Sequence, residues 1–243
     1  MARVLHYSNL DPARIVFEAP KKNAMGGMSV RAFYSHPDTN EQTPLIIQTP
    51  RMRLPFGLTS SERKGQNGDY VQYLFDAAFS NIESSQEMKA FYDKMSTLDD
   101  HIVATAEKNC EAWFGKKIPR AALDEFYKPN IKPAKDSKYA PTIRFKIPFR
   151  YDRFEMKAFR MVHEGGPKPE CRPIELTKDT IGDVFRKGAE CEFLVEFTSL
   201  WFVSKQFGAN FQAPQVRLCD TPTPRLSDYA FLDKGEEIEM CAD

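Results

Sequence analysis

Residues 84–117 have the sequence SSQEMKAFYDKMSTLDDHIVATAEKNCEAWFGKK, the most regular pattern in this chain of 243 residues. Its apolar positions recur at steps of three and four, which is the spacing of one face of an α-helix. The pattern predicts a single helix over residues 85–114, about 45 Å long at 1.5 Å per residue. The apolar residues on that face are Met88, Phe91, Met95, Leu98, Ile102, Ala106, Cys110 and Trp113.

The sequence also marks the two ends of this helix. Ser84 and Glu87 have the spacing of an N-terminal capping box, which satisfies free backbone N–H groups of the first turn. Gly115 stands where a left-handed residue commonly ends a helix, and Pro119 prevents continuation. The helix is therefore predicted to begin after Ser84 and to end before Gly115.

Extended segments are predicted on both sides of the helix, because they are rich in β-branched and aromatic residues and are bounded by polar turns. Four precede the helix, at residues 15–17, 28–34, 44–54 and 70–79, with a polar loop at residues 59–69. Four follow it, at residues 142–148, 154–162, 191–203 and 214–218. Residues 128–141 are rich in Pro and Lys and predict an extended, exposed connector.

The order of several strands, one long helix and more strands predicts a mainly β fold. One solution is an OB-fold-like antiparallel β-barrel with the helix inserted between strands three and four. The competing solution is a helix packed on an antiparallel sheet. We expect residues 1–218 to form one domain with extensions, and residues 219–243 to form an acidic C-terminal tail.

Charge is divided unevenly along the chain, although Lys and Arg total 34 and Asp and Glu also total 34. Residues 116–160 hold thirteen Lys and Arg against five Asp and Glu, a net charge of +8, with eight aromatic residues among them. Residues 219–243 hold two Lys and Arg against seven Asp and Glu, a net charge of −5. A basic segment with interleaved rings suits phosphates and unstacked bases. A solvated basic loop with a solubilising tail is the alternative that charge alone leaves open.

The sequence lacks the motifs of common enzyme classes. It has no GxxxxGK[ST] phosphate loop, its four histidines are scattered, and its five cysteines form no CxxC pair. We therefore expect no enzymatic activity, no cofactor and no metal site. No apolar run reaches the roughly 18 residues needed to span a bilayer, and the N-terminus lacks an apolar signal core, so we expect a soluble intracellular protein.

Two predicted strands present cations on one face. In residues 142–148, polar and apolar residues alternate, so that one face meets the core and the other carries positive charge. The outward residues are Thr142, Arg144 and Lys146, and the inward residues are Ile143, Phe145 and Ile147. In residues 44–54, Thr49, Arg51 and Arg53 share one face in the same way.

These faces and the aromatic residues near them are the candidate nucleic-acid contacts. Cations would follow the phosphate backbone, and rings would stack on bases. Tyr73 shares the parity of Val71 and Phe75, so a place in the core is its alternative, and for the cations the alternative is a solvated strand face. The candidates are Arg51, Arg53, Phe56, Tyr73, Lys138, Tyr139, Arg144, Lys146, Arg150 and Tyr151.

Several segments together resemble a known family of viral proteins. They are KKN at residues 21–23 with Gly26-Gly27, IIQTPRMRLPFGL at residues 46–58, FDAAF at residues 75–79, Trp113-Phe114, and FYKPNIKPAKDSKYAPTIRFKIP at residues 126–148. Over residues 14–218 the chain resembles the single-stranded DNA-binding protein family of nucleocytoplasmic large DNA viruses of algae and protists. That family is itself similar to the replication single-strand binding protein of short-tailed phages.

The resemblance implies an OB fold, non-enzymatic coating of replication intermediates, and an acidic tail that engages replication proteins. The partner-binding residues expected in that tail are Asp233, Glu236, Glu237, Glu239 and Asp243.

Charge pattern and resemblance lead to one hypothesis: sequence-tolerant binding of single-stranded DNA, coating intermediates of replication, recombination and repair. A structural or scaffold protein of a virion or replication complex, whose basic face contacts another protein, is the alternative. A degenerate enzyme or a processivity subunit is a third. The expected partners are single-stranded DNA and replication proteins, without a membrane, and a homodimer is compatible with the sequence. The expected location is the host cytoplasm or nucleus, at sites of viral DNA replication.

Overall fold

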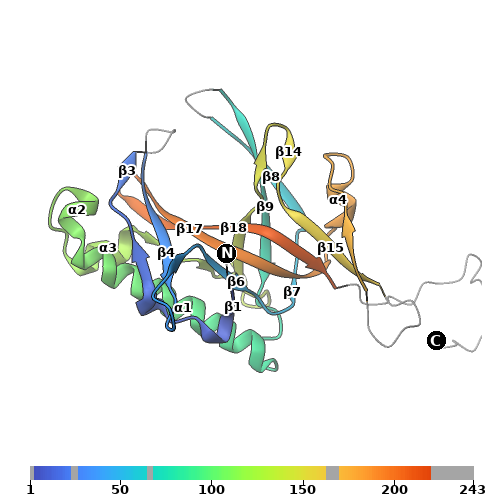
Figure 1. Ribbon diagram of the computed structural model, residues 1–243, viewed down its shortest axis with the longest axis horizontal. Helices are drawn as coiled ribbons and strands as arrows, with labels where there is room; N and C mark the ends of the chain where they lie inside the picture. Colours follow the sequence, from blue (N-terminus) through green and yellow to red (C-terminus); the bar gives the residue numbers. More distant parts are fainter. Residues whose placement is uncertain (1–2, 23–26, 65–67, 163–169, 220–243) are drawn as a thin grey trace, which may run out of the picture.

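The computed structural model describes residues 3–22, 27–64, 68–162 and 170–219, and within them the fold is mainly β with one long helix (Figure 1). The helices are α1 (Gln86–Lys108), α2 (Cys110–Phe114), α3 (Arg120–Phe126) and α4 (Ile181–Val184). The strands before α1 are β1 (Val4–His6), β2 (Ile15–Phe17), β3 (Lys21–Lys22), β4 (Met28–Ser35), β5 (Gln42–Thr43), β6 (Leu45–Gln48), β7 (Met52–Arg53), β8 (Leu58–Arg63) and β9 (Tyr70–Ala78). The strands after it are β10 (Tyr127–Lys128), β11 (Ile131–Lys132), β12 (Thr142–Lys146), β13 (Phe149–Arg150), β14 (Arg153–Phe154), β15 (Lys157–Val162), β16 (Glu170–Ile174), β17 (Glu190–Val203) and β18 (Gln206–Leu218).

Strands β17 and β18 form a long antiparallel hairpin that crosses the middle of the molecule (Figure 1). β17 also pairs with β7, β7 with β9, β9 with β12, and β12 with β18, so these five strands form a closed circuit of pairings. The helices α1, α2 and α3 are inserted between β9 and β12, which are neighbours in this circuit.

The prediction of an antiparallel β-barrel is wrong for the pairing of β1 with β6 and for one edge of β18. That edge pairs in turn with β10, β12 and β15, and all three pairings are parallel. With 13 residues, β18 is long enough to pair with these three strands one after another along its length. The sheet is therefore mixed, although most of the pairings in the circuit are antiparallel.

The long helix forms where the apolar pattern predicts it, with two differences at its ends. Ser85, not Ser84, is the N-cap residue, because its hydroxyl accepts from the Met88 N–H at 3.2 Å. The helix is also interrupted at Asn109, whose side-chain amide donates to the Thr105 carbonyl at 2.9 Å. Gly115 ends α2 with a φ of 72°, as predicted for a left-handed residue.

Two of the expected limits before α1 differ from the observed ones. Residues 59–69, expected as a loop, contain most of β8, which pairs along the first part of β9. The expected strand at residues 44–54 is divided into β6 and β7, because Thr49 turns inward. Its hydroxyl donates to the Pro50 carbonyl and accepts from the Phe193 N–H. Thr49 is 2% exposed, so the prediction that it shares an outward face with Arg51 and Arg53 is wrong.

The connector at residues 128–141 is attached to the long helix and is only partly exposed. Asn130 and Ile131 are buried, and Ile131 pairs with Ile143 across β11 and β12. Asp99 on α1 accepts hydrogen bonds from the Tyr127 hydroxyl at 2.6 Å and from the Asn130 backbone N–H at 3.1 Å. In a fully exposed connector, water would bind these polar groups, and here Asp99 binds them instead.

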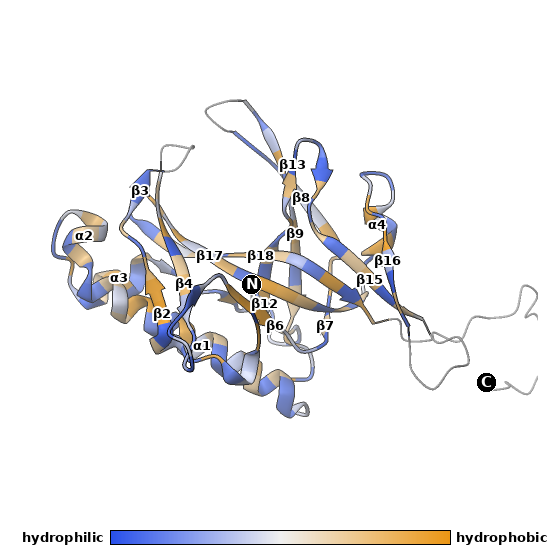
Figure 2. Ribbon diagram, viewed as in Figure 1, coloured by the Kyte–Doolittle hydropathy of each residue, from blue (hydrophilic) through white to orange (hydrophobic). Residues whose placement is uncertain are grey.

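The hydrophobic core joins the helix to the sheet. Phe91 on α1 packs against Phe79, with ring centroids 5.6 Å apart, and Phe193 on β17 packs against Phe75 of β9 and Phe145 of β12. Burying each such ring contributes on the order of 2 to 3 kcal/mol. Hydrophobic and hydrophilic residues alternate along the central strands and around α1 (Figure 2), so polar side chains remain on the outward faces.

Candidate nucleic-acid interface

A cleft of about 1180 Å³ lies between the β6–β7 segment, the residues around α4 and the N-terminal end of α1. Its charged lining residues are five cations and three carboxylates, which gives a net charge of +2. They are Arg51, Arg53, Arg160, Arg186 and Lys187, with Glu87, Asp183 and Glu190. We call this region the basic cleft.

Three cations of the basic cleft are not neutralised by neighbouring carboxylates. Arg51 forms an ion pair with Glu190, with 3.3 Å between Nε and Oε2. Arg53, Arg186 and Lys187 are exposed, and none of them forms an ion pair or side-chain hydrogen bond with a residue that the structure describes. Cations of this kind in a concave surface attract an anionic ligand.

Phe56 is held beside the basic cleft by a tight turn. Gly57 has a φ of 68°, and a Cβ at this position would lie 2.7 to 2.9 Å from backbone atoms of residues 185–187. The Leu58 N–H donates to the Phe185 carbonyl at 2.9 Å, which ties the turn to the same segment. The turn therefore needs glycine. The turn leaves Phe56 62% exposed, next to the segment that contains Arg186 and Lys187.

The outward face of β12 carries Arg144 and Lys146, and each binds a side chain of a neighbouring strand. Arg144 donates from Nε and Nη2 to the two carboxylate oxygens of Asp76 on β9, both at 2.7 Å. Lys146 donates from Nζ to Asn210 Oδ1 on β18, and burial lowers the pKa of Lys146. The alternation predicted for this strand is confirmed, since its apolar residues are buried. Both cations nevertheless have intramolecular partners, which the sequence did not reveal.

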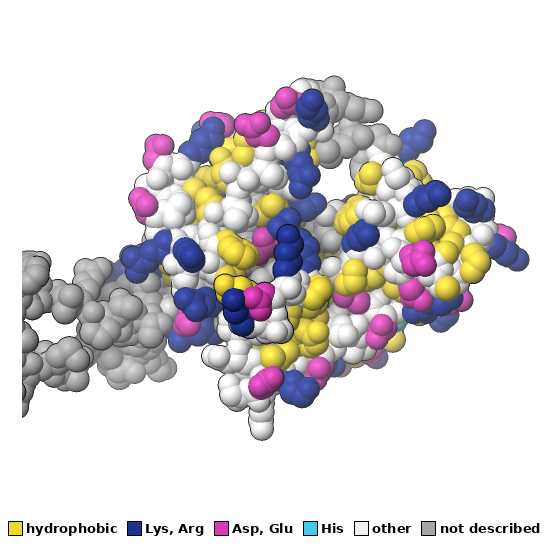
Figure 3. Space-filling view, turned by 180° about the vertical axis from the view of Figure 1, so that it is seen from behind, with side chains coloured by type: hydrophobic (Ala, Val, Ile, Leu, Met, Phe, Trp, Pro, Cys, Tyr) yellow, Lys and Arg dark blue, Asp and Glu magenta, His cyan; other side chains and the backbone are white. Residues whose placement is uncertain are grey.

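Strand register places Arg53 and Arg144 on the same face of the sheet. Arg53 lies opposite Ala78 of β9, and Arg144 lies opposite Asp76, two residues earlier on that strand. Because residues i and i+2 of a strand point to one side, Arg144 and then Lys146 lie on the same face of the sheet as Arg53, although neither lines the basic cleft. Lys and Arg side chains gather over the middle of the molecule seen from behind, close to a hollow in that surface (Figure 3).

Tyr73, Arg150 and Tyr151 belong to a separate aromatic cluster built on a hairpin. The Tyr73 ring packs edge-on against Phe149 and Phe154, at 4.9 Å between centroids in both cases. Strands β13 and β14 are joined by Tyr151 and Asp152, whose φ values are 48° and 63°. Two positive φ values are those of a type I′ hairpin turn. Tyr73 is therefore half-buried in ring contacts, whereas Tyr151 is 95% exposed at the tip of the hairpin.

Arg150 lies beside that tip and is partly neutralised. Its Nε is 3.7 Å from Glu155 Oε2, and the side chain is exposed. A weak exposed pair of this kind contributes little to stability and leaves the guanidinium accessible.

Lys138 and Tyr139 lie apart from the other candidates, near the long helix. Lys138 Nζ is 3.0 Å from Asp136 Oδ2 and lies 5.5 Å from the centroid of the Tyr139 ring. Tyr139 is 65% exposed and lines a cavity with residues of α1 and of the connector, including Tyr92 and Ile131. The fold therefore brings Arg51, Arg53, Phe56, Arg144 and Lys146 onto one surface and leaves this pair elsewhere.

The remaining predictions concern the tail and the absence of other sites. Asp233, Glu236, Glu237, Glu239 and Asp243 lie outside the described residues. In the described ranges, no three His, Cys, Asp or Glu side chains are grouped as metal ligands would be. Among helices in that same part of the chain, none combines the length and the apolar character needed to cross a membrane.

The sequence patterns did not single out three residues of the basic cleft: Arg160, Arg186 and Lys187. Arg186 and Lys187 follow the short helix α4 and precede Gly188, which has a φ of 87°. The pair of adjacent cations before a glycine is the feature of the sequence that could have identified this segment. Nothing in the local pattern linked it to Arg51 and Arg53, which are more than 130 residues earlier in the chain.

Comparisons with known proteins give limited matches. A family of unknown function (DUF5871) matches residues 174–233. An uncharacterized protein of Acanthamoeba polyphaga mimivirus is 25% identical over 180 residues, which are 74% of this chain and 27% of that protein. The chain thus spans about a quarter of the length of that relative.

Two solved structures are similar over most of the chain. One is the single-stranded DNA-binding protein of bacteriophage Enc34 in complex with single-stranded DNA. It is 12% identical, with 85% of this chain and 97% of the phage chain covered and a TM-score of 0.43. The other is a C-terminal truncation of the same phage protein, also 12% identical, covering 88% of this chain and 99% of that one with a TM-score of 0.39.

Proposed function

We propose that this protein binds single-stranded DNA without sequence preference. The observation that carries the proposal is the basic cleft, where Arg53, Arg186 and Lys187 are exposed and have no ion-pairing partner among the described residues. Each of these cations can contact a phosphate and release its counterions, and this contribution does not depend on the base sequence.

Single strands are favoured over duplex by the exposed rings near these cations. Phe56 is 62% exposed beside the cleft, and Tyr151 is 95% exposed on its hairpin. A stacked base adds roughly 1 to 3 kcal/mol on such a ring, but only if it is not already paired and stacked in a duplex. Phosphate contacts with ring contacts are the combination used by sequence-tolerant single-strand binders.

We infer that the closed circuit of β17, β7, β9, β12 and β18 is an OB-like barrel that forms the core of a domain over residues 1–218. The protein would coat intermediates of replication, recombination and repair, and the acidic tail at residues 219–243 would engage replication proteins. The mechanism needs no catalytic group, cofactor or metal.

The proposal is tested by measuring binding to oligo-dT and to a duplex of equal length, using fluorescence anisotropy between about 50 and 200 mM salt. We expect tighter binding to oligo-dT and a steep loss of affinity as salt rises. The triple substitution Arg53→Ala, Arg186→Ala and Lys187→Ala should reduce the salt slope by roughly 2, since each phosphate contact on a single strand contributes about 0.7.

A matched control removes three exposed cations at the opposite end of the long helix: Lys108→Ala, Lys116→Ala and Lys117→Ala. This variant has the same change of net charge but should keep the salt slope of the unmodified protein. Equal affinity for single strands and duplex, or equal slopes for the two triple variants, would refute the proposed site. Binding to neither form would support a surface that contacts another protein.

A further inference from the structure

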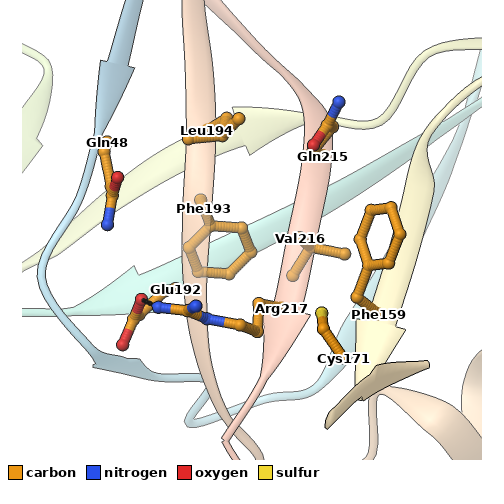
Figure 4. A pocket seen from close by; sticks show the side chains of 9 residues that line it. All are labelled: Gln48, Phe159, Cys171, Glu192, Phe193, Leu194, Gln215, Val216 and Arg217. Carbon is orange, nitrogen blue, oxygen red and sulfur yellow. Dashed lines mark hydrogen bonds and ion pairs between the residues drawn. The ribbon is translucent and has the colours of Figure 1, made fainter. Parts of the chain in front are cut away.

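A cavity of about 310 Å³, less polar than the basic cleft, lies on the outward face of the sheet (Figure 4). Strands β6, β17, β18 and β15 each turn side chains into it, and β16 adds Cys171 at its edge. Its size is at the lower end of the range for small-molecule sites, roughly 300 to 1,000 Å³. The lining residues are Gln48, Phe159, Cys171, Glu192, Phe193, Leu194, Gln215, Val216 and Arg217.

The lining combines two phenylalanine rings, aliphatic groups and amides. Phe159 stands on one side of the cavity and Gln48 on the other, with Gln215 and Leu194 at one end (Figure 4). The opposite end is closed by an ion pair between Arg217 and Glu192. A flat heteroaromatic ligand fits this chemistry, because Phe159 can stack on its face and the Gln215 amide on the neighbouring strand can both donate to and accept from its edge.

The cavity lies next to the basic cleft, and contacts between side chains connect their linings. Glu190 and Glu192 point to the same side of β17; Glu190 pairs with Arg51 in the cleft, and Glu192 pairs with Arg217 in the cavity. Cys219 lines the cleft, and its Sγ lies 3.8 Å from Glu192 Oε1. A chain with a charged backbone and flat side groups could therefore place its backbone in the cleft and one side group in the cavity.

We propose that this cavity receives one unstacked nucleobase of the single strand whose phosphates lie in the basic cleft. The base stacks on Phe159, and its edge contacts the Gln215 amide on the neighbouring strand. Because an amide presents both a donor and an acceptor, bases of either type are accepted. This inference rests on the proposed function and adds a defined base-binding position to it.

The rate of labelling of Cys171 reports directly whether a base occupies the cavity, because this residue lines it. Cys171 is exposed, whereas Cys110, Cys191 and Cys219 are buried. In the full chain with Cys241→Ser, the rate at which a bulky maleimide labels Cys171 is measured alone, with oligo-dT, and with an abasic oligonucleotide that has the same number of phosphates. Both oligonucleotides are used at equal occupancy, which is set by anisotropy.

We expect oligo-dT to slow the labelling at least several-fold and the abasic strand to leave it nearly unchanged. Equal protection by the two strands, or none by oligo-dT, would overturn the base-binding position. The anisotropy measurement separates this result from a failure of the proposed function, in which neither oligonucleotide binds.

A substitution provides an independent test. Phe159→Ala should weaken oligo-dT binding about tenfold, by loss of one stacking contact, and should not change binding of the abasic strand. The matched control is Phe33→Ala on β4, which removes a half-buried outward ring that does not line the cavity and should change neither affinity.

Phe159→Trp retains a stacking ring if the alanine variant fails to fold. Its fluorescence should then be quenched by oligo-dT but not by the abasic strand, after subtraction of the unmodified protein. Equal quenching by both strands, or none by oligo-dT, would contradict the inference.

Discussion

The ion pair between Arg144 and Asp76 should act mainly in folding. Arg144 donates two hydrogen bonds of 2.7 Å to the carboxylate of Asp76, whose side chain is only 9% exposed. Replacing Arg144 by Ala removes both donors and leaves a carboxylate with little access to water. Replacing Asp76 by Ala leaves the guanidinium, which is 38% exposed and can be hydrated.

The size of each effect follows from this asymmetry. Breaking a fully buried ion pair costs roughly 3 to 5 kcal/mol, and a surface pair is worth about 0 to 1 kcal/mol. Because more than a third of the Arg144 side chain is exposed, we expect Arg144→Ala to lower the free energy of unfolding by about 2 kcal/mol. Asp76→Ala should lower it by about 1 kcal/mol, since the remaining cation is solvated. The double variant should lose about 2 kcal/mol in total, giving a coupling free energy near 1 kcal/mol.

Urea denaturation of the four proteins measures these free energies at one pH and one salt concentration. Arg144→Lys serves as a control, because it keeps the charge but loses the two-bond geometry and should be intermediate. Salt-dependent binding of oligo-dT is measured on the same variants under conditions where all are folded. Additive effects of the two single substitutions would refute the argument. So would an Arg144→Ala variant that is as stable as the unmodified protein.

Three further predictions concern pH, the tail and the Phe56 turn. Burial raises the pKa of Asp99 to about 6 from its ordinary value of 3.8, against the opposing effect of its hydrogen bonds. The folded state therefore holds this proton more tightly, and stability is lost as pH rises from about 4 to 6. Relative to the unmodified protein, Asp99→Asn should gain roughly 2 kcal/mol between pH 4 and 7 in urea denaturation, and a constant difference would contradict this. Removing residues 227–243 should tighten oligo-dT binding, most of all at low salt. The reason is that the tail follows Cys219 at the basic cleft and competes with DNA for it at an effective concentration on the order of millimolar. Unchanged affinity at every salt concentration would show that the tail only keeps the protein in solution. Gly57→Ala should lower the free energy of unfolding by more than about 2 kcal/mol, because the added Cβ would collide with the backbone of residues 185–187. The control is Gly115→Ala, which has a similar φ but no atom within 4 Å of the added Cβ, and it should lower the free energy of unfolding by only about 1 kcal/mol. Equal losses in the two variants would show that the contact with residues 185–187 does not limit the substitution.

Sequence periodicity alone determined the elements whose signals are local. Steps of three and four predicted the buried face of α1 and α2, and Gly115 marked the end because a left-handed backbone favours glycine. Alternation predicted the inward and outward faces of β12 correctly. The short-range signals failed where a distant partner decided the outcome. Thr49 turns inward because its hydroxyl binds the Phe193 N–H, 144 residues later in the chain.

The composition of the candidate interface was decided only by the tertiary structure. Arg144 was recognised as an outward cation, but its partner Asp76 is 68 residues away and is reached only through the pairing of β9 with β12. Arg53 joins the same face through Ala78, and the segment with Arg186 and Lys187 reaches the cleft through backbone hydrogen bonds to the turn at residues 54–58. A strand's sequence shows which side chains point outward. Which outward cations lie together, and which are already paired, depends on strand register and loop packing, and contacts between residues far apart in the chain set both.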